Sequence, residues 1–300
     1  MSSLFDTLLE KAKSFQSNTI SEASKSTYQT YLKLYETTME KLNEDPYPIQ
    51  IDKMMVFIQF QKDSGLEYNS LKSCISSLSF YFRSNSLDNL TYDIRFINFH
   101  KGVLRDMKYH RDPNRKLPWD PKFFSAYLLH YPLNQLYNTQ FLFFMSISYY
   151  GFLRISELQH LKKEDISIEE DHQRLKLFIR YSKTDQNGEG ETTYIYNNDK
   201  DYSPYKLFTL IKDSFADGNY IVSCSGAALR QHLKVVLKQL CINPNDFSWH
   251  SFRRGGAHQA ALLGIQDCDI KKHGRWKSEA YMRYVDVNPE FAGASITNKI

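Results

Sequence analysis

The pattern of apolar and polar positions in the first third of the chain follows helical spacing. Between Ser24 and Leu42, apolar or aromatic side chains recur at positions 28, 31, 32, 35 and 39, which form one face of a helix. The same spacing predicts further helices over residues 51–61, 69–83 and about 92–107. No convincing alternating strand pattern occurs in this part of the sequence. Residues 1–110 are therefore predicted to form a small helical bundle.

The periodic pattern stops at residues 111–121. This stretch, RDPNRKLPWDP, contains three prolines and little apolar periodicity, so we interpret it as a linker. Its basic side chains Arg111, Arg115 and Lys116 could contact phosphate groups. From charge alone, a solvated connector and a phosphate-binding segment are equally favoured.

Residues 122–300 form the second predicted domain. Helical spacing is expected over 123–131 and over the strongly apolar stretch 138–150. Gly151 is expected to end the second of these helices in a left-handed turn. The sequence that follows, FLRISELQHLKKEDI, is expected to begin a new helix that carries Arg154.

Three short stretches then favour strands, at residues 166–168, 175–181 and 192–196. The segments between them are polar, so an antiparallel meander is predicted. From Tyr205 onward the pattern is helical again. The predicted fold class is mainly α with a small antiparallel β-sheet (α+β).

Composition narrows the class of protein without identifying it. The 300 residues are 42% hydrophobic and 24% charged, which is typical of a globular chain. The net charge of +4 is compatible with a polyanionic partner but does not establish one. The four cysteines are scattered, with no metal-binding spacing, so neither a metal site nor a disulfide framework is expected. No secretory signal or long apolar run is present, and we expect a soluble, intracellular protein without a membrane partner.

The most informative stretch follows Ser248 and contains WHSFRRGGAHQAALLGIQDCDIKKHGRWKSEAYMRYV. It holds His250 and Arg253 in a His-x-x-Arg pattern, then Trp276 in Gly-Arg-Trp, then Tyr284 eight residues later. This order resembles the C-terminal half of the catalytic domain of tyrosine recombinases, the phage-integrase type of site-specific recombinase.

Two upstream boxes extend the resemblance. Arg154 lies in GFLRISEL, with Glu157 three residues later, and is similar to the first arginine box of that family. Lys183 lies in YSKTDQNG, between the second and third predicted strands, where the family places a hairpin lysine.

The resemblance implies cleavage of a DNA backbone without a metal or another cofactor. Arg154, Arg253 and Trp276 would hold the scissile phosphate, because guanidinium groups match its charge and geometry. Glu157 would orient neighbouring catalytic groups. Arg254, beside Arg253, would at most contact the DNA backbone.

The same resemblance assigns the steps of bond breaking. Tyr284 would attack the phosphorus atom and form a 3′-phosphotyrosine. Lys183 would protonate the departing 5′ oxygen, and His250 would assist proton transfer.

Each of these residues also has an ordinary interpretation. Taken alone, Arg154 could form a surface salt bridge, Lys183 could be a turn lysine, and His250 could cap a helix. His273 competes with Trp276 for its position, and Tyr281 competes with Tyr284. The family spacing from Trp276 to its tyrosine is about nine residues, which favours Tyr284, and Tyr281 is then expected to serve packing.

At the level of the whole chain, the resemblance implies a helical core-binding domain over residues 1–110 and a catalytic domain over 122–300. The two would clamp double-stranded DNA, with a dimer on one site and a tetramer during synapsis. The implied function is that of a site-specific recombinase or transposon integrase, in the nucleus of a eukaryote or otherwise in the cytoplasm. The alternatives are a catalytically silent DNA-binding relative and a type IB topoisomerase.

Overall fold

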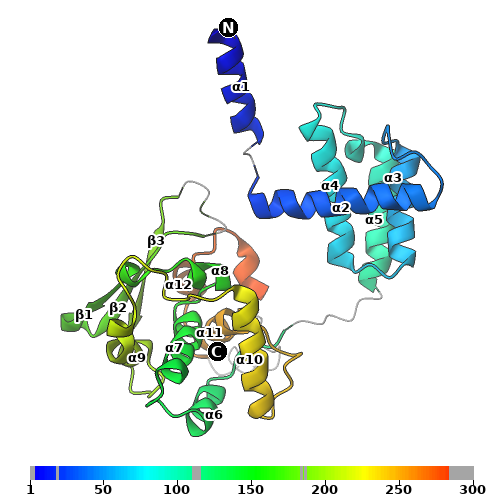
Figure 1. The fold of residues 1–300 in the computed structure, drawn as a ribbon. Coiled ribbons are helices and arrows are strands. Elements are labelled where there is room, and N and C mark those ends of the chain that lie inside the picture. Colours follow the sequence, from blue (N-terminus) through cyan, green and yellow to red (C-terminus); the bar gives the residue numbers. More distant parts are fainter. Residues whose placement is uncertain (1–3, 18–19, 110–115, 183–184, 186–187, 284–300) are drawn as a thin grey trace, which may run out of the picture. The chain divides into compact units, whose positions relative to one another are not determined.

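The structure is a computed structural model, and it describes residues 4–17, 20–109, 116–182, 185 and 188–283. The chain divides into two compact units, Met1–Pro113 and Asn114–Ile300 (Figure 1). Both the helical first unit and the mixed second unit agree with the predicted fold class. Among the described residues, no helix is both long enough and apolar enough to cross a membrane.

The first unit is a helical bundle, as predicted. Its helices are α1 (Leu4–Ser17), α2 (Glu22–Lys41), α3 (Ile51–Asp63), α4 (Tyr68–Ser84) and α5 (Ile94–Tyr109), with a short 3-10 turn at Leu90–Tyr92. The apolar positions that predicted α2 to α5 supply its core, including Tyr35, Met54, Phe57, Leu71 and Phe96. The helix α1 lies before the first helix that the periodicity indicated.

The second unit packs its helices against one side of its sheet (Figure 1). Its helices are α6 (Lys122–His130), α7 (Leu136–Tyr150), α8 (Ile155–Gln159), α9 (Pro204–Ile211), α10 (Gly226–Gln239), α11 (His250–Leu262) and α12 (Asp267–His273). Short 3-10 turns occupy Lys163–Asp165, Glu170–His172, Lys212–Ser214 and Glu279–Arg283.

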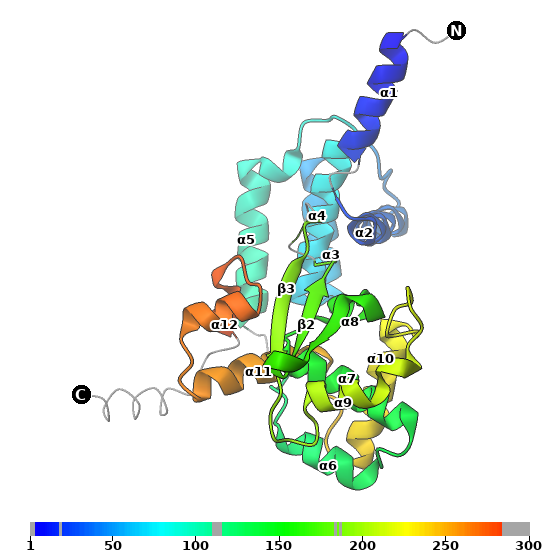
Figure 2. The same ribbon diagram turned by 90° about the vertical axis from the view of Figure 1, so that its left-hand side faces the viewer.

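The predicted meander is confirmed as a three-stranded antiparallel sheet in the order β1-β2-β3 (Figure 1). Figure 2 shows β2 and β3 side by side. The strands are β1 (Ile166–Glu169), β2 (Arg174–Ile179) and β3 (Glu191–Tyr196). Leu175 pairs with Ile168 on one side and with Ile195 on the other. Alternate residues of β2 are buried, as expected for a sheet with one face against a core.

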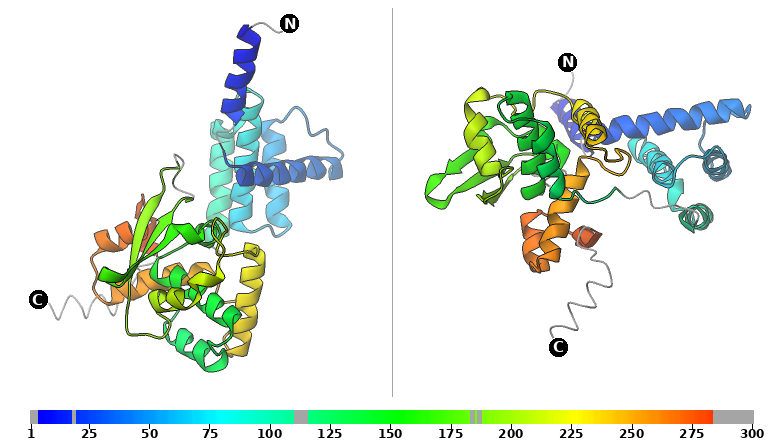
Figure 3. Two further views of the ribbon diagram at one scale, coloured as in Figure 1. Left: turned by 60° about the vertical axis from the view of Figure 1, so that its left-hand side comes forward. Right: turned by 90° about the horizontal axis from the view of Figure 1, so that it is seen from below.

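The helix α7 lies at the centre of this unit because it is apolar on nearly all sides. It packs against both α9 and α11, and Figure 3 shows α11 in orange against α7 in green. The helix α12 follows α11 along the chain. The two glycines of α11 permit this approach. A Cβ atom on Gly256 would stand 2.2 Å from the carbonyl oxygen of Tyr149, and one on Gly255 would stand 2.3 Å from that of Trp119.

Part of the predicted linker belongs to the second unit. The backbone N–H of Leu117 donates to the carbonyl of Asp246 at 2.7 Å, and that of Trp119 donates to Ser251 at 2.9 Å. Trp119 is buried and lies 4.5 Å from the ring of Phe252. A buried tryptophan thus fixes this segment to the α11 region, which the prolines in the sequence had obscured.

Two local predictions between α7 and the sheet are wrong. Gly151 has an ordinary negative φ, and the left-handed residue is Phe152, with φ of 48°. Gly151 is needed for space instead, because a Cβ there would meet the carbonyl of Ile147 at 2.8 Å. The helix expected to follow is only five residues long, and Arg154 stands just before it as the N-cap.

Candidate active site

A buried carboxylate collects three arginines. The Glu157 side chain, on α8, is closed to solvent. It accepts from the guanidinium of Arg154 at 2.5 Å and from that of Arg275 at 3.0 Å. The guanidinium of Arg253 lies 3.7 Å away. We call these four residues the arginine cluster.

The short helix α8 explains how Arg154 and Glu157 meet. Arg154 is the N-cap, with an extended backbone, and Glu157 is the third helical residue. The carboxylate of Glu157 accepts the backbone N–H of Arg154 at 2.9 Å, as in a capping box. The cap fixes the backbone of both residues, and the Arg154 guanidinium bends back to the same carboxylate.

Arg253 and Trp276 form the next layer of the site. Arg253, on α11, is completely buried and donates to the carbonyl oxygens of Phe152 at 2.5 Å and Gly274 at 2.6 Å. Its guanidinium lies 4.2 Å from the centre of the Trp276 ring, a cation–π contact. Trp276 also packs against Phe152. The structure therefore brings together the two arginines and the tryptophan that the sequence predicted.

His250 stands at the start of α11, exposed at its surface. The protein atoms around its imidazole lower its pKa to about 4, and the positive charges of Arg253 and Arg154 act in the same direction. Glu157 opposes them only in part. At neutral pH the imidazole is therefore uncharged and able to accept a proton.

His273 takes a different position from Trp276. Its Nε2 lies 2.7 Å from the carbonyl oxygen of Tyr150, and its Nδ1 lies 3.5 Å from the hydroxyl of Thr193. Burial lowers its pKa. Both ring nitrogens face protein atoms that join α12 to α7 and β3, which favours a structural role for His273.

Four predicted site residues, Lys183, Tyr284, Arg111 and Arg115, lie outside the described residues. The residue before Lys183 is described. Ser182 is buried, and its hydroxyl donates to Glu157 at 3.3 Å. The segment that leaves β2 thus reaches the arginine cluster immediately before the predicted lysine.

The competing tyrosine, Tyr281, is described and is buried. Its ring lies 6.2 Å from that of Trp276, and its hydroxyl lies 3.5 Å from the carboxylate of Asp267. It belongs to a small apolar cluster with Phe152, Trp276 and Ile270. These contacts fit the packing role that the sequence suggested for it.

Arg254 and Lys116 both form hydrogen bonds with backbone carbonyl groups. Arg254 donates to the backbone carbonyl of Lys116 at 2.5 Å, and the ammonium of Lys116 donates to the carbonyl of Asn245. Both side chains thus help to attach the entering segment to α11. Their predicted contact with DNA stays a prediction.

One member of the arginine cluster was missed by the sequence analysis. Arg275 lies inside the Gly-Arg-Trp motif, between the two candidates His273 and Trp276. Its position in that motif was the available signal. Its chemistry depends on neighbours 118 to 124 residues away in the chain, which no local pattern displays.

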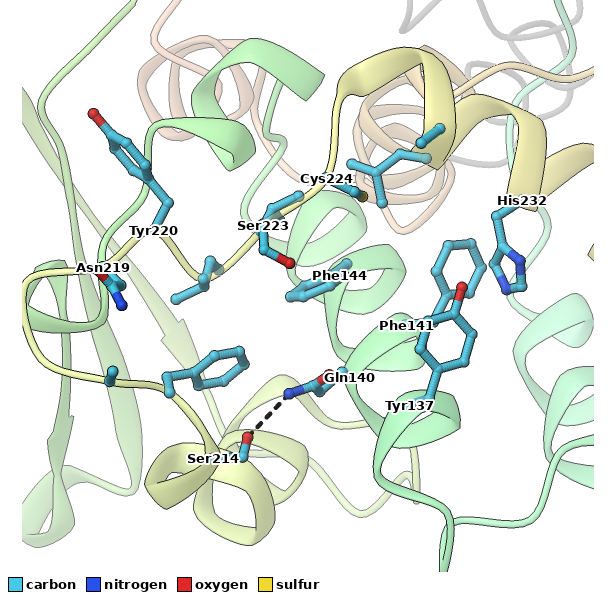
Figure 4. Close-up of a pocket in the computed structure, with 16 residues that line it drawn as sticks. Tyr137, Gln140, Phe141, Phe144, Ser214, Asn219, Tyr220, Ser223, Cys224 and His232 are labelled. Carbon is cyan, nitrogen blue, oxygen red and sulfur yellow. Dashed lines mark hydrogen bonds between the residues drawn. The ribbon is translucent and has the colours of Figure 1, made fainter.

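A separate cavity of about 440 Å³ opens between α7, α10 and the segment before α10 (Figure 4). Phe141, Phe144 and His232 line it, and Gln140 donates to Ser214 across it at 3.1 Å. No residue of the arginine cluster lines this cavity. This cavity is therefore separate from the arginine cluster.

Comparison with known proteins identifies the fold. No family model matches the chain, and no curated protein matches its sequence. Among solved structures, it is similar to the Tn1549 transposon integrase in complex with transposon right end DNA. The TM-score is 0.67 at 14% identity, over 94% of this chain and 95% of the other.

Two further structures agree with this similarity. The XerH site-specific recombinase bound to a palindromic difH substrate gives a TM-score of 0.65 at 12% identity, over 91% of this chain and 78% of the other. A lambda integrase dimer bound to a COC′ core site gives 0.62 at 16% identity, over 93% and 76%. The chain has the fold of these tyrosine recombinases.

Proposed function

We propose that this chain is a site-specific DNA recombinase or integrase that breaks and rejoins DNA through a 3′-phosphotyrosine. The observation that supports the proposal best is the arginine cluster. Three guanidiniums surround one carboxylate, so the cluster keeps an excess positive charge next to His250 and Trp276. An anionic phosphodiester is a fitting substrate for such a site.

The arginines would act on the charge that develops during cleavage. Arg154 and Arg253 donate to the non-bridging oxygens of the scissile phosphate, whose negative charge increases as the nucleophile approaches. Trp276 covers the guanidinium of Arg253 and excludes water from it. Arg154 is partly exposed and is held by Glu157 before the substrate arrives, which favours preorganised donors. Arg253 is buried in the free protein, so it must be uncovered before it can reach the phosphate.

The covalent step exchanges one phosphoester bond for another. The Tyr284 phenol oxygen attacks phosphorus, and the bond from phosphorus to the 5′ oxygen breaks. The neutral imidazole of His250 accepts the phenolic proton, and Lys183 gives a proton to the 5′ oxygen. The reverse reaction, with a 5′ hydroxyl from another strand, rejoins the DNA. The phosphotyrosine keeps the energy of the broken bond, so ATP is not required.

The proposal extends to the partners of the chain. The similar solved structures contain DNA, and the lambda integrase structure is a dimer on its site. We infer that double-stranded DNA is the substrate, that residues 1–110 form a core-binding domain, and that copies assemble on DNA as dimers and then tetramers. The site of action would be inside the cell, where chromosomal or element DNA is available.

The test begins by finding a DNA site. The Tyr284→Phe variant of the full chain selects tightly bound duplexes from a randomised library, because it should bind without cleaving. The selected duplex is then nicked near its centre, so that cleavage releases a short strand and traps the adduct. Wild type, Tyr284→Phe and Tyr281→Phe are incubated with it in EDTA and separated on a denaturing gel.

We expect a covalent protein–DNA band with wild type and Tyr281→Phe, and none with Tyr284→Phe. Loss of the band only with Tyr281→Phe would move the nucleophile to that residue. Binding of the selected duplex with no adduct from wild type would overturn the catalytic proposal in favour of a DNA-binding protein. Relaxation of a supercoiled plasmid that lacks the selected sequence would favour a topoisomerase.

A further inference from the structure

Arg275 is buried and has an unusual backbone conformation. Its φ is 57°, in the left-handed region that residues with a side chain seldom adopt. Only 5% of the residue is exposed. A long cationic side chain is unfavourable under both conditions unless its contacts compensate. Its contacts therefore indicate why an arginine stands here.

The guanidinium of Arg275 joins three separate segments. One nitrogen donates to the carbonyl oxygens of Gly151 at 3.1 Å and His273 at 3.0 Å. The other nitrogen donates to the carbonyl of Phe152 at 3.0 Å and to the Glu157 carboxylate at 3.0 Å. A single planar group thus connects the end of α7, the end of α12 and the carboxylate of α8.

Two of these acceptors also serve the proposed phosphate-binding arginines. The carbonyl of Phe152 accepts from Arg253 at 2.5 Å as well as from Arg275. The carboxylate oxygen of Glu157 that meets Arg275 also accepts the backbone N–H of Arg154 at 2.9 Å. Arg275 therefore shares one acceptor with Arg253 and another with Arg154.

We propose that Arg275 is a positioning residue of the cleavage site, which holds Glu157 and the Phe152 carbonyl so that Arg154 and Arg253 are presented together to one phosphate. This inference rests on the proposed function. Arg275 itself need not touch DNA. Its fork of donors suits the task better than a lysine, which offers a point charge without a fixed plane.

The charges around Glu157 give the proposal a consequence in pH. Its carboxylate faces Arg154 from the start of α8, Arg253 and His250 from α11, Ser182 after β2, and Arg275 after α12. Burial alone would raise the pKa of Glu157, but the charges of Arg275 and then Arg253 outweigh burial, and the pKa lies below its ordinary value.

Removal of Arg275 should therefore raise the pKa of Glu157. The carboxylate would then take up a proton at a higher pH than in the wild type. Protonation weakens its hold on Arg154 and Arg253, so cleavage should fail earlier as the pH is lowered. A residue that only stabilises the fold would not shift this pH limit.

The experiment compares full-length Arg275→Gln and Arg275→Lys with wild type and with Arg174→Gln. Arg174 is the matched control because it also pairs with a carboxylate, Glu169 at 2.6 Å, at the opposite end of β2 from the loop that carries Ser182. For each protein we would measure thermal unfolding, affinity for the selected nicked duplex, and the rate of adduct formation at saturating DNA between about pH 3.5 and pH 9. This range includes the acid limit expected from the lowered pKa of Glu157.

We expect Arg275→Gln to bind the duplex nearly as wild type does but to form adduct on the order of 10²-fold more slowly, as for misplaced catalytic groups. The pH below which adduct formation fails should be higher than in wild type. Arg275→Lys should restore part of the rate and shift this pH part of the way back towards the wild-type value. Arg174→Gln should keep the wild-type rate and pH profile.

Three outcomes would overturn the inference. These are a folded Arg275→Gln with the wild-type rate, a slower rate with an unchanged pH limit and no recovery by lysine, and failure of both variants to fold. Absence of adduct from wild type, by contrast, would remove the proposed function itself. The wild-type lane therefore separates the two failures.

Discussion

At the scale of single residues, the site is organised by charge balance around one carboxylate. Glu157 is closed to solvent, yet three guanidiniums and a serine hydroxyl face it. Breaking a buried charge pair by removing one partner typically costs about 3–5 kcal/mol. Removal of Glu157 alone would therefore leave its arginines without their counter-charge and destabilise the unit.

His250 provides a test of the electrostatics at this scale. We expect its imidazole to titrate at a pKa of about 4 in the free protein, because of the protein atoms around the ring and the charges of Arg253 and Arg154. Nuclear magnetic resonance of the imidazole Cε1–H would measure it, with His250→Gln to assign the signal. A duplex bound to Tyr284→Phe should raise this pKa, since a phosphate offsets the positive charges.

The lowered pKa of His250 also makes the stability of the folded protein depend on pH. The folded pKa lies below the ordinary value of 6.5, so the folded protein binds fewer protons than the unfolded chain between these two values. The contribution of His250 to stability is present above pH 6.5 and is lost as the pH falls towards 4. Titration of the free protein near 6.5 would contradict the proposed charge arrangement.

Much of the site could be predicted from the identities of its residues, but the hydrogen bonds that join them could not. Arg154, Arg253 and Trp276 could be predicted because their spacing matches a known pattern, and the structure brings them together. Arg275 could not be predicted from spacing. Its left-handed backbone and its contacts with Gly151 and Glu157 exist only after distant segments have packed.

At the scale of elements, the course of the chain around α8 depends on caps. The sequence analysis expected one new helix to begin in the segment after Gly151, but the structure has the five-residue helix α8 and then the 3-10 turn Lys163–Asp165. Glu157 caps the first by accepting from Arg154, and Asp165 caps the second by accepting the backbone N–H of Lys162 at 3.0 Å. Helix and turn share the same apolar spacing over so few residues, so periodicity could not separate them.

The packing of α11 leads to a prediction for its glycines. In Gly255→Ala the new Cβ would lie 2.3 Å from the backbone carbonyl of Trp119, which cannot move without shifting the entering segment. We expect a loss of at least about 1–3 kcal/mol in the free energy of unfolding, as for other overpacked sites. Urea denaturation followed by tryptophan fluorescence would measure it, since the three tryptophans, Trp119, Trp249 and Trp276, all belong to this unit.

Gly226→Ala is the matched control on α10 in the same unit. There the nearest atom is the end of the Gln159 side chain, at 2.7 Å, which can rotate away. Its effect should stay within about 0.5 kcal/mol, as for ordinary surface changes. Equal effects of the two substitutions would show that close approach of α11 is not the reason for Gly255.

At the scale of the whole molecule, this chain shares its fold with solved structures whose sequences differ from it at most positions. Identities to the similar structures are 12–16%, yet the match covers more than nine-tenths of this chain. Each unit has its own apolar core, so the helical spacing and the strand alternation could be predicted locally. The unit boundary was less predictable, because Trp119 joins the second core from a proline-rich segment.

The first unit offers a surface on which its proposed DNA-binding role can be tested. A cavity of about 390 Å³ is lined by Arg83 and Lys101, with Tyr28 and Tyr92 beside them. Both basic residues are exposed at this surface. Cations and aromatic rings in one hollow suit a sugar–phosphate backbone, because each cation that neutralises a phosphate releases a counterion.

We expect the double variant Arg83→Gln/Lys101→Gln to weaken binding of the selected duplex and of unrelated duplexes by similar factors. The slope of log K against log salt concentration should decrease in magnitude by about 2, close to 0.9 for each lost phosphate contact. Fluorescence anisotropy over a range of salt concentrations would measure both. Lys62→Gln is the control, because that ammonium is already paired with Asp106 at 2.7 Å. If the double variant kept the wild-type slope, this hollow would not contact the DNA backbone, and the first unit would have to bind through another face.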